Sequence, residues 1–522
     1  MRTSISFCFC FLFLTLAAWA QENLNVELLD VKTRPNSVRY SGSAGYVDDQ
    51  GNEYGFVGAR AGFAAYIIEF DTLRFIEEIS GPQSNWREIA VLGDYAYVST
   101  EGFGNGQGLQ VIDLSFLPDS LSLVATFDAE FTRGHIVQVD YFFPDSNYVY
   151  VAGVTPGGGV RILDVNDPAN PQLAGTYEPY YIHDVHIRGD IMYAAALFEG
   201  TLDIVDISDK SNPQLLTQLS YPNPFTHSAF TDVTGDILFV CDEIDGTPMR
   251  VWDISDLDNP EEIAQYSGNF QSLVHNPYVV GDFNYIAHNT EGLRVLDIVD
   301  PAVPVEVGFY DTWSDVSGGF FGLWSAWPFL PSGRILGGDR FGGLYLWSFN
   351  ETYAGRIYGT VRDSITGQAL FNANIELGEA WVSTSDLMGK YAAGAIPGDY
   401  TLSCSLSGYQ TKNVSLSLEG MDSLAVDIEL APITTSIESL ATIPNVEIGP
   451  NPSLGMLNVY FGGHKTGRLS LHTIDGQEVL VKQLAPNLLN TLDIHSLVNG
   501  MYIASLHVEG ATPFSQKLVI QH

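Results

Sequence analysis

The sequence predicts an all-β protein in which a seven-bladed β-propeller, closed by a terminal strand, precedes two small β-sandwich domains. The first observation is an apolar phrase that recurs about every 45 residues, a spacing typical of propeller blades. The second is a composition with 51 glycines and 12% aromatic but only 16% charged residues, which favours many short strands and turns. The third is that no long amphipathic helix pattern occurs.

The recurring phrase is clearest in GLRVLDIVDPAVPVEVG, from Gly292 to Gly308. The apolar run around Asp297 is typical of a strand buried on both faces, and Asp300-Pro301 breaks it before a second strand starts at Val305. The acidic position recurs at steps of 44, 51, 42, 47 and 44 residues, by subtraction along Glu69, Asp113, Asp164, Asp206, Asp253 and Asp297. We expect these aspartates to accept hydrogen bonds from the following turn, which is a structural role.

Each phrase is preceded by a strand pair with a turn in its middle, as in HDVHIRGDIMYAAAL from His183. A blade is therefore an inner hairpin, the strand of the phrase and an outer strand. The last copy ends near Phe349 without an outer strand, while Asn25 to Lys32 near the N-terminus has no hairpin partner. We expect this segment to complete the last blade, which removes two exposed edges.

Residues 1–20 read as a secretory signal peptide, with an apolar stretch and the ending Ala18-Trp19-Ala20. The propeller is then predicted over 21–353, and no transmembrane segment is expected in the mature chain. Cys241 and Cys404 fall in different predicted domains, so no disulfide between them is expected.

The formal net charge is −39, from 23 basic and 62 acidic residues. Nucleic acids and anionic membranes are bound by basic surfaces, so neither is expected as a partner. Two interpretations of the acidity stay open, solubility and the binding of divalent cations.

Residues 354–431 alternate apolar and polar residues around glycine turns, which predicts a two-sheet sandwich. Motifs such as Gly359-Thr360-Val361, Gly389-Lys390-Tyr391 and Pro397-Gly398-Asp399-Tyr400 resemble the carboxypeptidase regulatory-like domain. The resemblance implies a non-catalytic spacer or protein-contact module.

A linker is predicted over 432–444, and residues 445–522 again alternate like a β-sandwich. This segment resembles the C-terminal sorting domain of the bacterial type IX secretion system. The residues that carry the resemblance are Pro450, Asn451, Pro452, Gly476, Gly500, Tyr502 and Lys517. It implies a Gram-negative source, the type IX machinery as a partner, and passage through the periplasm to the outer cell surface or the medium.

The repeats resemble the LVIVD repeat and, from about Asn25 to Phe349, the choice-of-anchor B family of secreted bacterial propellers. Supporting stretches include TLDIVDISDKSNPQLL from Thr201 to Leu216 and GLWSAWPFLPSG from Gly322 to Gly333. This resemblance implies a fold and a location but no ligand.

Candidate site residues start the inner hairpins. They are His135, His183, His227 and His275, at steps of 48, 44 and 48 residues, with Trp86 and Trp324 each 49 residues beyond the ends of this series. First residues of innermost strands line the channel mouth, so we expect these six side chains to converge there. Neutral imidazoles from several strands favour a divalent metal ion as the cofactor.

Three residues near the ends of second strands are further candidates for metal ligands: Asp242, Glu243 and His288. A structural role for the ring, with side chains hydrogen-bonded between neighbouring strands, is the alternative.

Conventional enzyme signatures such as GxSxG and HExxH are absent from the sequence, and no catalytic residue is assigned. Three functions stay open. The first is a surface or secreted binding protein for an unknown protein or glycan, with loop aromatics such as Trp313, Phe320 and Phe321 at its contact face. The second is a metal-dependent hydrolase or lyase that uses the histidine ring, and the third is a structural component of the surface or matrix.

Overall fold

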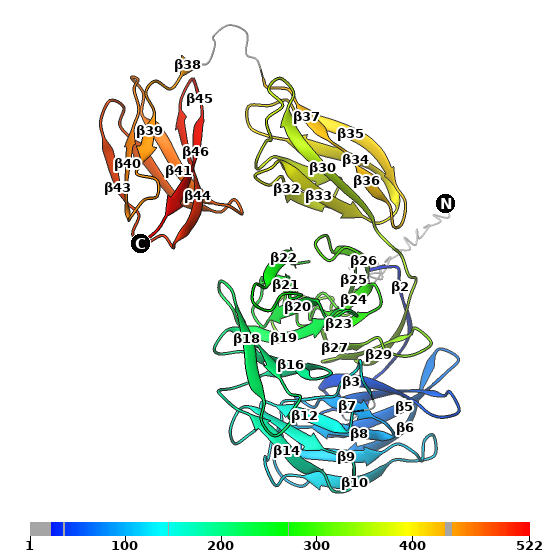
Figure 1. Cartoon of the computed structure of the whole chain (residues 1–522). Coiled ribbons are helices and arrows are strands. Elements are labelled where there is room, and N and C mark those ends of the chain that lie inside the picture. The colour runs from blue at the N-terminus through cyan, green and yellow to red at the C-terminus, as the bar shows by residue number, and fades with distance from the viewer. Residues whose placement is uncertain (1–21, 35–36, 145, 270, 380, 434–440) are drawn as a thin grey trace, which may run out of the picture. The chain divides into compact units, whose positions relative to one another are not determined.

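The computed structural model describes residues 22–34, 37–144, 146–269, 271–379, 381–433 and 441–522, so the predicted signal peptide, 1–20, lies outside the described residues. All regular elements in these ranges are strands, which confirms the all-β class (Figure 1). The chain divides into two compact units, Met1–Thr352 and Tyr353–His522. A search of the same ranges finds no helix with the length and apolar character needed to cross a membrane.

The first unit consists of antiparallel sheets formed by strands that follow one another in the sequence. Seven such sheets occur in its described residues, and six of them have four strands. In chain order, the first strands of the sheets are β3 (Tyr40–Val47), β7 (Ile89–Leu92), β11 (Ile136–Gln138), β15 (Asp184–Arg188), β19 (Thr226–Thr231), β23 (Asn276–Val280) and β27 (Leu323–Trp327). The second strands are β4 (Glu53–Ala59), β8 (Tyr95–Ser99), β12 (Tyr148–Ala152), β16 (Ile191–Ala196), β20 (Ile237–Asp242), β24 (Phe283–Ala287) and β28 (Ile335–Asp339).

The third and fourth strands of these sheets are the two strands of the recurring phrase. The third strands are β5 (Gly62–Glu69), β9 (Leu109–Asp113), β13 (Val160–Asp164), β17 (Thr201–Asp206), β21 (Met249–Asp253), β25 (Leu293–Asp297) and β29 (Gly343–Phe349). The fourth strands are β6 (Thr72–Ser80), β10 (Ser122–Phe127), β14 (Gln172–Tyr177), β18 (Gln214–Ser220), β22 (Glu261–Tyr266) and β26 (Val305–Tyr310).

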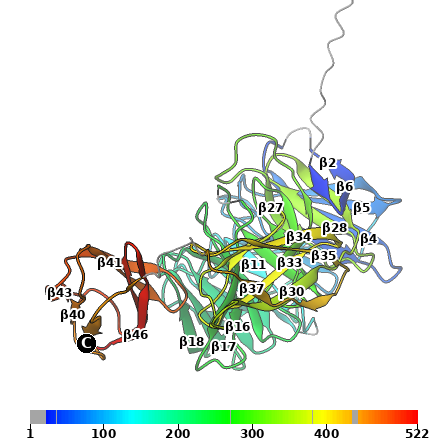
Figure 2. The ribbon, with the colours of Figure 1, turned by 90° about the horizontal axis from the view of Figure 1, so that it is seen from above.

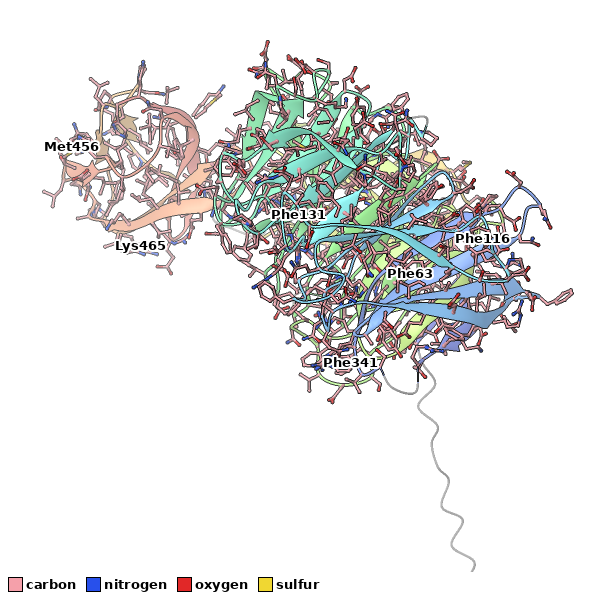
Figure 3. All side chains as sticks on the ribbon, turned by 90° about the horizontal axis from the view of Figure 1, so that it is seen from below. Phe63, Phe116, Phe131, Phe341, Met456 and Lys465 are labelled. Carbon is pink, nitrogen blue, oxygen red and sulfur yellow. The ribbon has the colours of Figure 1, made fainter. Side chains whose placement is uncertain are left out.

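Neighbouring sheets contact each other through their first strands. The contacts run in order from β3 through β7, β11, β15, β19, β23 and β27, and β27 contacts β3 again. The first three strands of each sheet are largely buried, whereas outer strands such as β18 and β22 are mostly exposed. Apolar side chains therefore fill the space between sheets, and Figure 3 labels two of the buried rings, Phe63 and Phe131.

The N-terminal segment joins two sheets. β2 (Val26–Lys32) pairs with β29, which is the pairing that the sequence analysis expected, and Figure 2 shows β2 beside β6. β1 (Asn23–Leu24) adds a fifth strand to the sheet of β26, which was not predicted. Asn25 connects the two strands with a φ of 54° and donates a hydrogen bond from Nδ2 to the carbonyl of Val307, 2.7 Å away. Asparagine tolerates this left-handed conformation better than most residues.

The repeated aspartates have the predicted structural role. In each of five sheets the carboxylate accepts a hydrogen bond of 2.8–3.0 Å from the backbone N–H two residues later, at Asp113, Asp164, Asp206, Asp253 and Asp297. These bonds fix the turn that starts the outer strand.

Residues Gly355–Leu430 form two sheets around one core that includes Ile357, Leu377, Leu402 and the free cysteine Cys404. One sheet contains β33 (Lys390–Ala395), β30 (Gly355–Asp363), β36 (Ser423–Ala425) and β37 (Ile428–Leu430). The other contains β32 (Trp381–Thr384), β31 (Asn374–Leu377), β34 (Gly398–Ser405) and β35 (Lys412–Leu418).

The C-terminal segment also has two larger sheets around a core of its own, which includes Leu457, Leu471, Leu506 and Leu518. One contains β39 (Glu447–Gly449), β40 (Met456–Tyr460) and β43 (Asn490–Asp493), and the other contains β42 (Glu478–Leu484), β41 (Gly467–Thr473), β44 (Gly500–Val508) and β46 (Phe514–Ile520). A short pair, β38 (Ala441–Thr442) and β45 (Ala511–Thr512), is parallel.

Candidate metal site in the repeat unit

The four histidines and Trp324 form a continuous row of rings, called here the histidine arc. Successive ring centroids lie 4.3 Å apart from His135 to His183, 4.4 Å to His227, 4.1 Å to His275 and 4.4 Å to Trp324. Each residue lies in or beside the first strand of its sheet, so the contacts between first strands bring the rings together. All five side chains are buried.

The hydrogen bond of His227 indicates which of its ring nitrogens carries the proton. His227 Nδ1 lies 3.1 Å from the carbonyl oxygen of His275. A carbonyl only accepts, so this Nδ1 donates and Nε2 of His227 keeps a free lone pair. His275 Nδ1 lies 3.2 Å from the carbonyl oxygen of Trp324 and 3.0 Å from the amide nitrogen of Asn276, so His275 has both an acceptor and a donor beside the same ring nitrogen, and its Nε2 lies near Glu243. Both Nε2 atoms are buried and have no hydrogen-bond partner among the described residues. Burial also holds the pKa of His183, His227 and His275 below the ordinary value, so these rings are neutral at pH 7.

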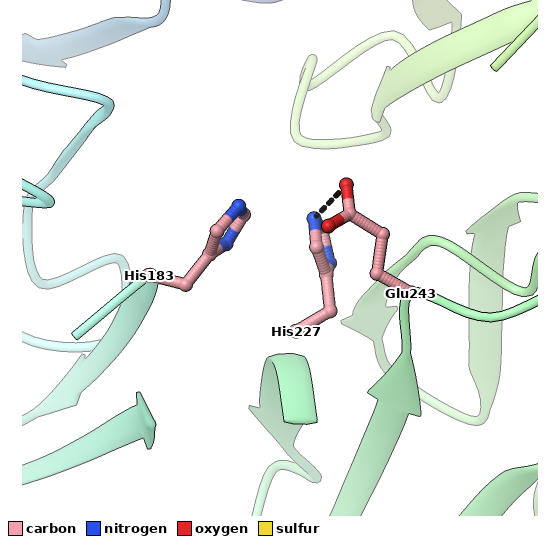
Figure 4. A group of neighbouring side chains, drawn as sticks. All are labelled: His183, His227 and Glu243. Carbon is pink, nitrogen blue, oxygen red and sulfur yellow. Dashed lines mark ion pairs between the residues drawn. The ribbon is translucent and has the colours of Figure 1, made fainter. Parts of the chain in front are cut away.

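Glu243 follows β20 and extends toward the arc (Figure 4). Its Oε1 lies 3.8 Å from His227 Nε2 and 4.0 Å from His275 Nε2. Burial raises the pKa of this carboxyl to about 7. One ligand atom each from His183, His227 and Glu243 lie within 4.8 Å of one another, so small side-chain movements would let all three contact one ion.

This group has the donor types of a transition-metal site. Two imidazoles and one carboxylate leave coordination positions free for water or a ligand. Metal-bound histidines usually donate their second ring N–H to a carbonyl or carboxylate, and His227 already does so. The residues therefore fit a divalent metal ion.

His135 differs from the other arc histidines. Its Nδ1 lies 2.7 Å from Oε1 of Glu101. Burial alone would lower the pKa of His135, but the hydrogen bond and charge of Glu101, with Glu88 and Glu243 nearby, raise it overall. His135 does not belong to the group of His183, His227 and Glu243, so it lies in the arc but outside the proposed set of ligands.

Besides His135 and His275, two further predicted ligands lie outside the group, Asp242 and His288. Asp242 accepts hydrogen bonds at Oδ1 from Phe225 N, at 2.8 Å, and from the hydroxyl of Tyr221, at 3.1 Å. His288 Nε2 lies 3.1 Å from the carbonyl oxygen of Ser267. Glu243, the residue after Asp242, extends toward the arc instead.

Trp86 lies one residue away from the register position that corresponds to His135. The pairing of β7 with β8 and of β11 with β12 aligns Ile89 with Val137. Arg87 therefore holds the place of His135 in its sheet, and Trp86 precedes it. The side chain of Arg87 turns away and donates to the carbonyls of Ala59 and Pro82.

Glu88 and Arg340 were missed by the sequence analysis. Glu88 is partly buried and accepts a 2.8 Å hydrogen bond at Oε1 from Nε1 of Trp324. Burial raises the pKa of Glu88 to about 7. The spacing of Arg340 in the sequence could have identified it. Glu243, Asn289 and Arg340 follow one another at intervals of 46 and 51 residues by subtraction, which are close to the length of one repeat.

Beneath the arc the interior is filled. Tyr141 and Phe329 stack with ring centroids 4.8 Å apart, and Phe230 and Tyr278 pack against them. The cavity lined by Gln138, Asp184, Ser228 and Asn276 measures only about 10 Å³, which is room for about one water molecule. This cavity is therefore too small for a larger ligand.

Comparison with known families identifies all three parts of the chain. The LVIVD repeat matches residues 85–128, 145–178, 181–220 and 275–312. The carboxypeptidase regulatory-like domain matches 356–431, and the secretion system C-terminal sorting domain matches 447–521. The chain carries LVIVD repeats and an export domain. The sorting domain indicates type IX secretion to the cell surface or the medium. Comparison with curated proteins gives no match, and the resemblance to the choice-of-anchor B family stays a prediction.

The predicted sorting residues lie within the matched segment. Asn451 donates from Nδ2 to the carbonyl of Lys517, at 2.7 Å, and accepts at Oδ1 from Val519 N, at 2.8 Å. Pro450 and Pro452, on either side of Asn451, follow cis peptide bonds, and Gly476 occupies a turn with φ of 92°. Gly500 starts β44, where Tyr502 is buried and donates to the carbonyl of Val498.

Proposed function

We propose that the chain is an exported binding protein whose repeat unit holds a divalent transition-metal ion at one mouth of a central channel. The observation that carries the proposal is the group of His183, His227 and Glu243, with one ligand atom of each within 4.8 Å of the others. The neutral rings support it, because neutral imidazole is the form that binds metal, and each ring has a buried nitrogen without a partner among the described residues, Nδ1 in His183 and Nε2 in His227. The ion would hold water or a ligand at its free positions, and no reaction is assigned.

The same proposal includes the architecture that positions the site. We infer seven blades around the channel, closed where β2 completes the sheet of β27, β28 and β29. The circular order of contacts between first strands and the pairing of β2 with β29 support this closure. The segments 354–431 and 445–522 then act as a spacer and as the export signal.

Thermal unfolding of the full chain tests the metal proposal. A ligand that binds only the folded state adds about 2.7 kcal/mol of stability at a free concentration 100 times its dissociation constant. Zn²⁺ added to the chelator-treated chain should raise the midpoint of the transition that reports on the repeat unit. The His183→Ala/His227→Ala variant should show no such increase, and an equal increase in both proteins would contradict the proposal.

A second candidate function is the binding of a glycan or protein at exposed loop aromatics. Trp313 and Phe321 stack at 5.0 Å, Phe321 and Phe341 at 5.6 Å, and Phe320 and Phe321 are 45% and 43% exposed. Stacked exposed rings are common in binding surfaces. On a glycan array, Phe321→Ala should abolish binding while the double histidine variant still binds. The opposite pattern would assign binding to the arc.

A further inference from the structure

Arg340 is a buried cation that forms no ion pair among the described residues, and the charges of Glu88 and Asp339 act on it from a longer distance. It follows β28, is 7% exposed, and its Nε and Nη1 atoms have no hydrogen-bond partner among the described residues. Its guanidinium carbon lies 4.8 Å from the ring centroid of Trp324 and 5.5 Å from that of Trp86. Indole faces stabilise a cation, but they do not satisfy the N–H groups at its edge.

Two other arginines of the repeat unit, Arg250 and Arg294, have carboxylate partners, whereas the buried Arg87 donates to the carbonyls of Ala59 and Pro82. Arg250 is 8% exposed, lies over the ring of Tyr221 and pairs with Glu262 at 2.9 Å. Arg294 pairs with Glu291 and Glu306, each at 3.2 Å. Arg340 has the same kind of aromatic support without the carboxylate. Leaving such a charge unpaired costs free energy, so an anion from outside the chain would stabilise it.

Arg39 lies near Arg340, and Arg60 lies next to Arg39 along the backbone hydrogen bonds. The backbone N–H of Tyr40 donates to the carbonyl of Arg340, and that of Arg60 donates to the carbonyl of Arg39. The guanidinium of Arg39 lies 3.9 Å from the ring centroid of Phe341, which Figure 3 labels. Within the described ranges none of the three arginines forms an ion pair. In a chain with a net charge of −39, this small basic region would attract anions selectively.

The basic region adjoins the histidine arc. Trp324, over which Arg340 lies, is the last ring of the arc, and the charge of Arg340 contributes to the low pKa of His275. Asn289 holds the place of Arg340 in the neighbouring sheet and is fully buried with no partner for its Oδ1. Glu243 holds that place one sheet further on. Arg340 therefore belongs to the same ring of positions as a proposed metal ligand.

We propose that Arg340, flanked by Trp86 and Trp324, binds the oxyanion group of a small ligand at the channel mouth, beside the metal. The inference deepens the proposed function. It rests on that proposal only where the ligand would also contact the metal ion. A guanidinium presents paired N–H groups that match the two oxygens of a carboxylate, and this geometry also accepts phosphate. A ligand with an oxyanion at one end and a metal-binding group at the other would contact both parts of the site.

Calorimetric titration of the full chain with acetate, glutarate and inorganic phosphate at low ionic strength tests the proposal, with and without bound Zn²⁺. We expect saturable binding of at least one probe. Arg340→Gln should weaken it about tenfold or more, the size expected for a charged hydrogen bond. Arg250→Gln is the matched control, with similar burial and an aromatic neighbour, and should bind like the unsubstituted chain. The best-binding probe separates a carboxylate ligand from a phosphate ligand.

The remaining outcomes separate this inference from the metal proposal. If the chain holds no metal but binds the probes through Arg340, the metal proposal fails and the oxyanion site stands. If it holds metal but binds no probe, or binds equally well after Arg340→Gln, the oxyanion site is overturned. Should Arg340→Gln fail to fold, Arg340→Lys keeps the charge but loses the paired N–H geometry. Unchanged affinity in that variant would also overturn the proposal.

Discussion

His227 Nε2 and Glu243 Oε1 lie 3.8 Å apart, one from the first strand and one from the end of the second strand of the same sheet. The hairpin of β19 and β20 therefore supplies two of the three proposed ligands, and the neighbouring sheet supplies His183. Two ligands on one hairpin keep a constant spacing when neighbouring sheets shift. This favours a preformed site.

Replacing Glu243 by Gln should weaken the affinity for Zn²⁺ by at least about 100-fold, because loss of a residue that only supports a metal ligand already costs 10–100-fold. Glu101→Gln is the matched control, since Glu101 holds the corresponding place in another sheet but contacts His135. Competition with a chelating dye measures both affinities. Equal affinities would remove Glu243 from the ligand set.

Glu88 should make stability depend on pH. Burial raises its pKa to about 7 from the ordinary 4.5, so the folded chain binds more protons than the unfolded chain between these values. The contribution of Glu88 to the free energy of unfolding is present at low pH and is lost as the pH rises through 7. This rise in pKa corresponds to at most about 3 kcal/mol. Urea unfolding measures the free energy of unfolding of the parent chain and of Glu88→Gln at pH 5 and at pH 8. The parent chain should lose more of this free energy than the variant between these two pH values. A pH-independent difference would contradict the assignment.

The pairing of β2 with β29 should be essential for the repeat unit. Val26 is 1% exposed, whereas its neighbour Glu27 is exposed. Val26→Asp should destabilise the repeat unit by at least about 3 kcal/mol, because it removes a buried apolar side chain and buries a charge. Glu27→Lys should be close to neutral. Denaturant unfolding compares the two, and similar midpoints would show that β2 contributes little.

Asn451 should be required for export. Both of its polar side-chain atoms bond to the backbone of β46, near Lys517 and Val519, so Asn451→Ala leaves two backbone groups without these partners. We expect less chain at the cell surface and in the medium, and more in the periplasm. Deletion of residues 447–521 gives the reference for complete loss. Unchanged export by Asn451→Ala would show that this contact is dispensable.

The sequence predicted the row of rings because a residue at the first position of every inner hairpin must face its equivalents in neighbouring sheets. It could not predict which ring nitrogens are free, since this depends on the carbonyl groups of His275 and Trp324. The shift from Trp86 to Arg87 arose because spacing alone does not fix register, and an error of one residue reverses the side of the strand.

The same alternation explains the remaining differences. Glu243 was predicted together with Asp242 and His288, but the latter two lie one place earlier and bond to the connections from the preceding sheets, at Tyr221, Phe225 and Ser267. The sequence position of Arg340 does not predict that two of its nitrogens lack hydrogen-bond partners. This depends on how far the acidic side chains lie from Arg340 in the folded chain. The extra strand pair of β1 with β26 depends on a change of direction at Asn25, which composition does not specify.

The most direct test of the metal proposal is elemental analysis of the purified full chain beside its His183→Ala/His227→Ala and His288→Ala variants. The account predicts about one equivalent of a divalent transition metal in the parent chain and in His288→Ala, and none in the double variant. Equal metal content in all three proteins, or none in a parent chain supplied with Zn²⁺, would contradict it.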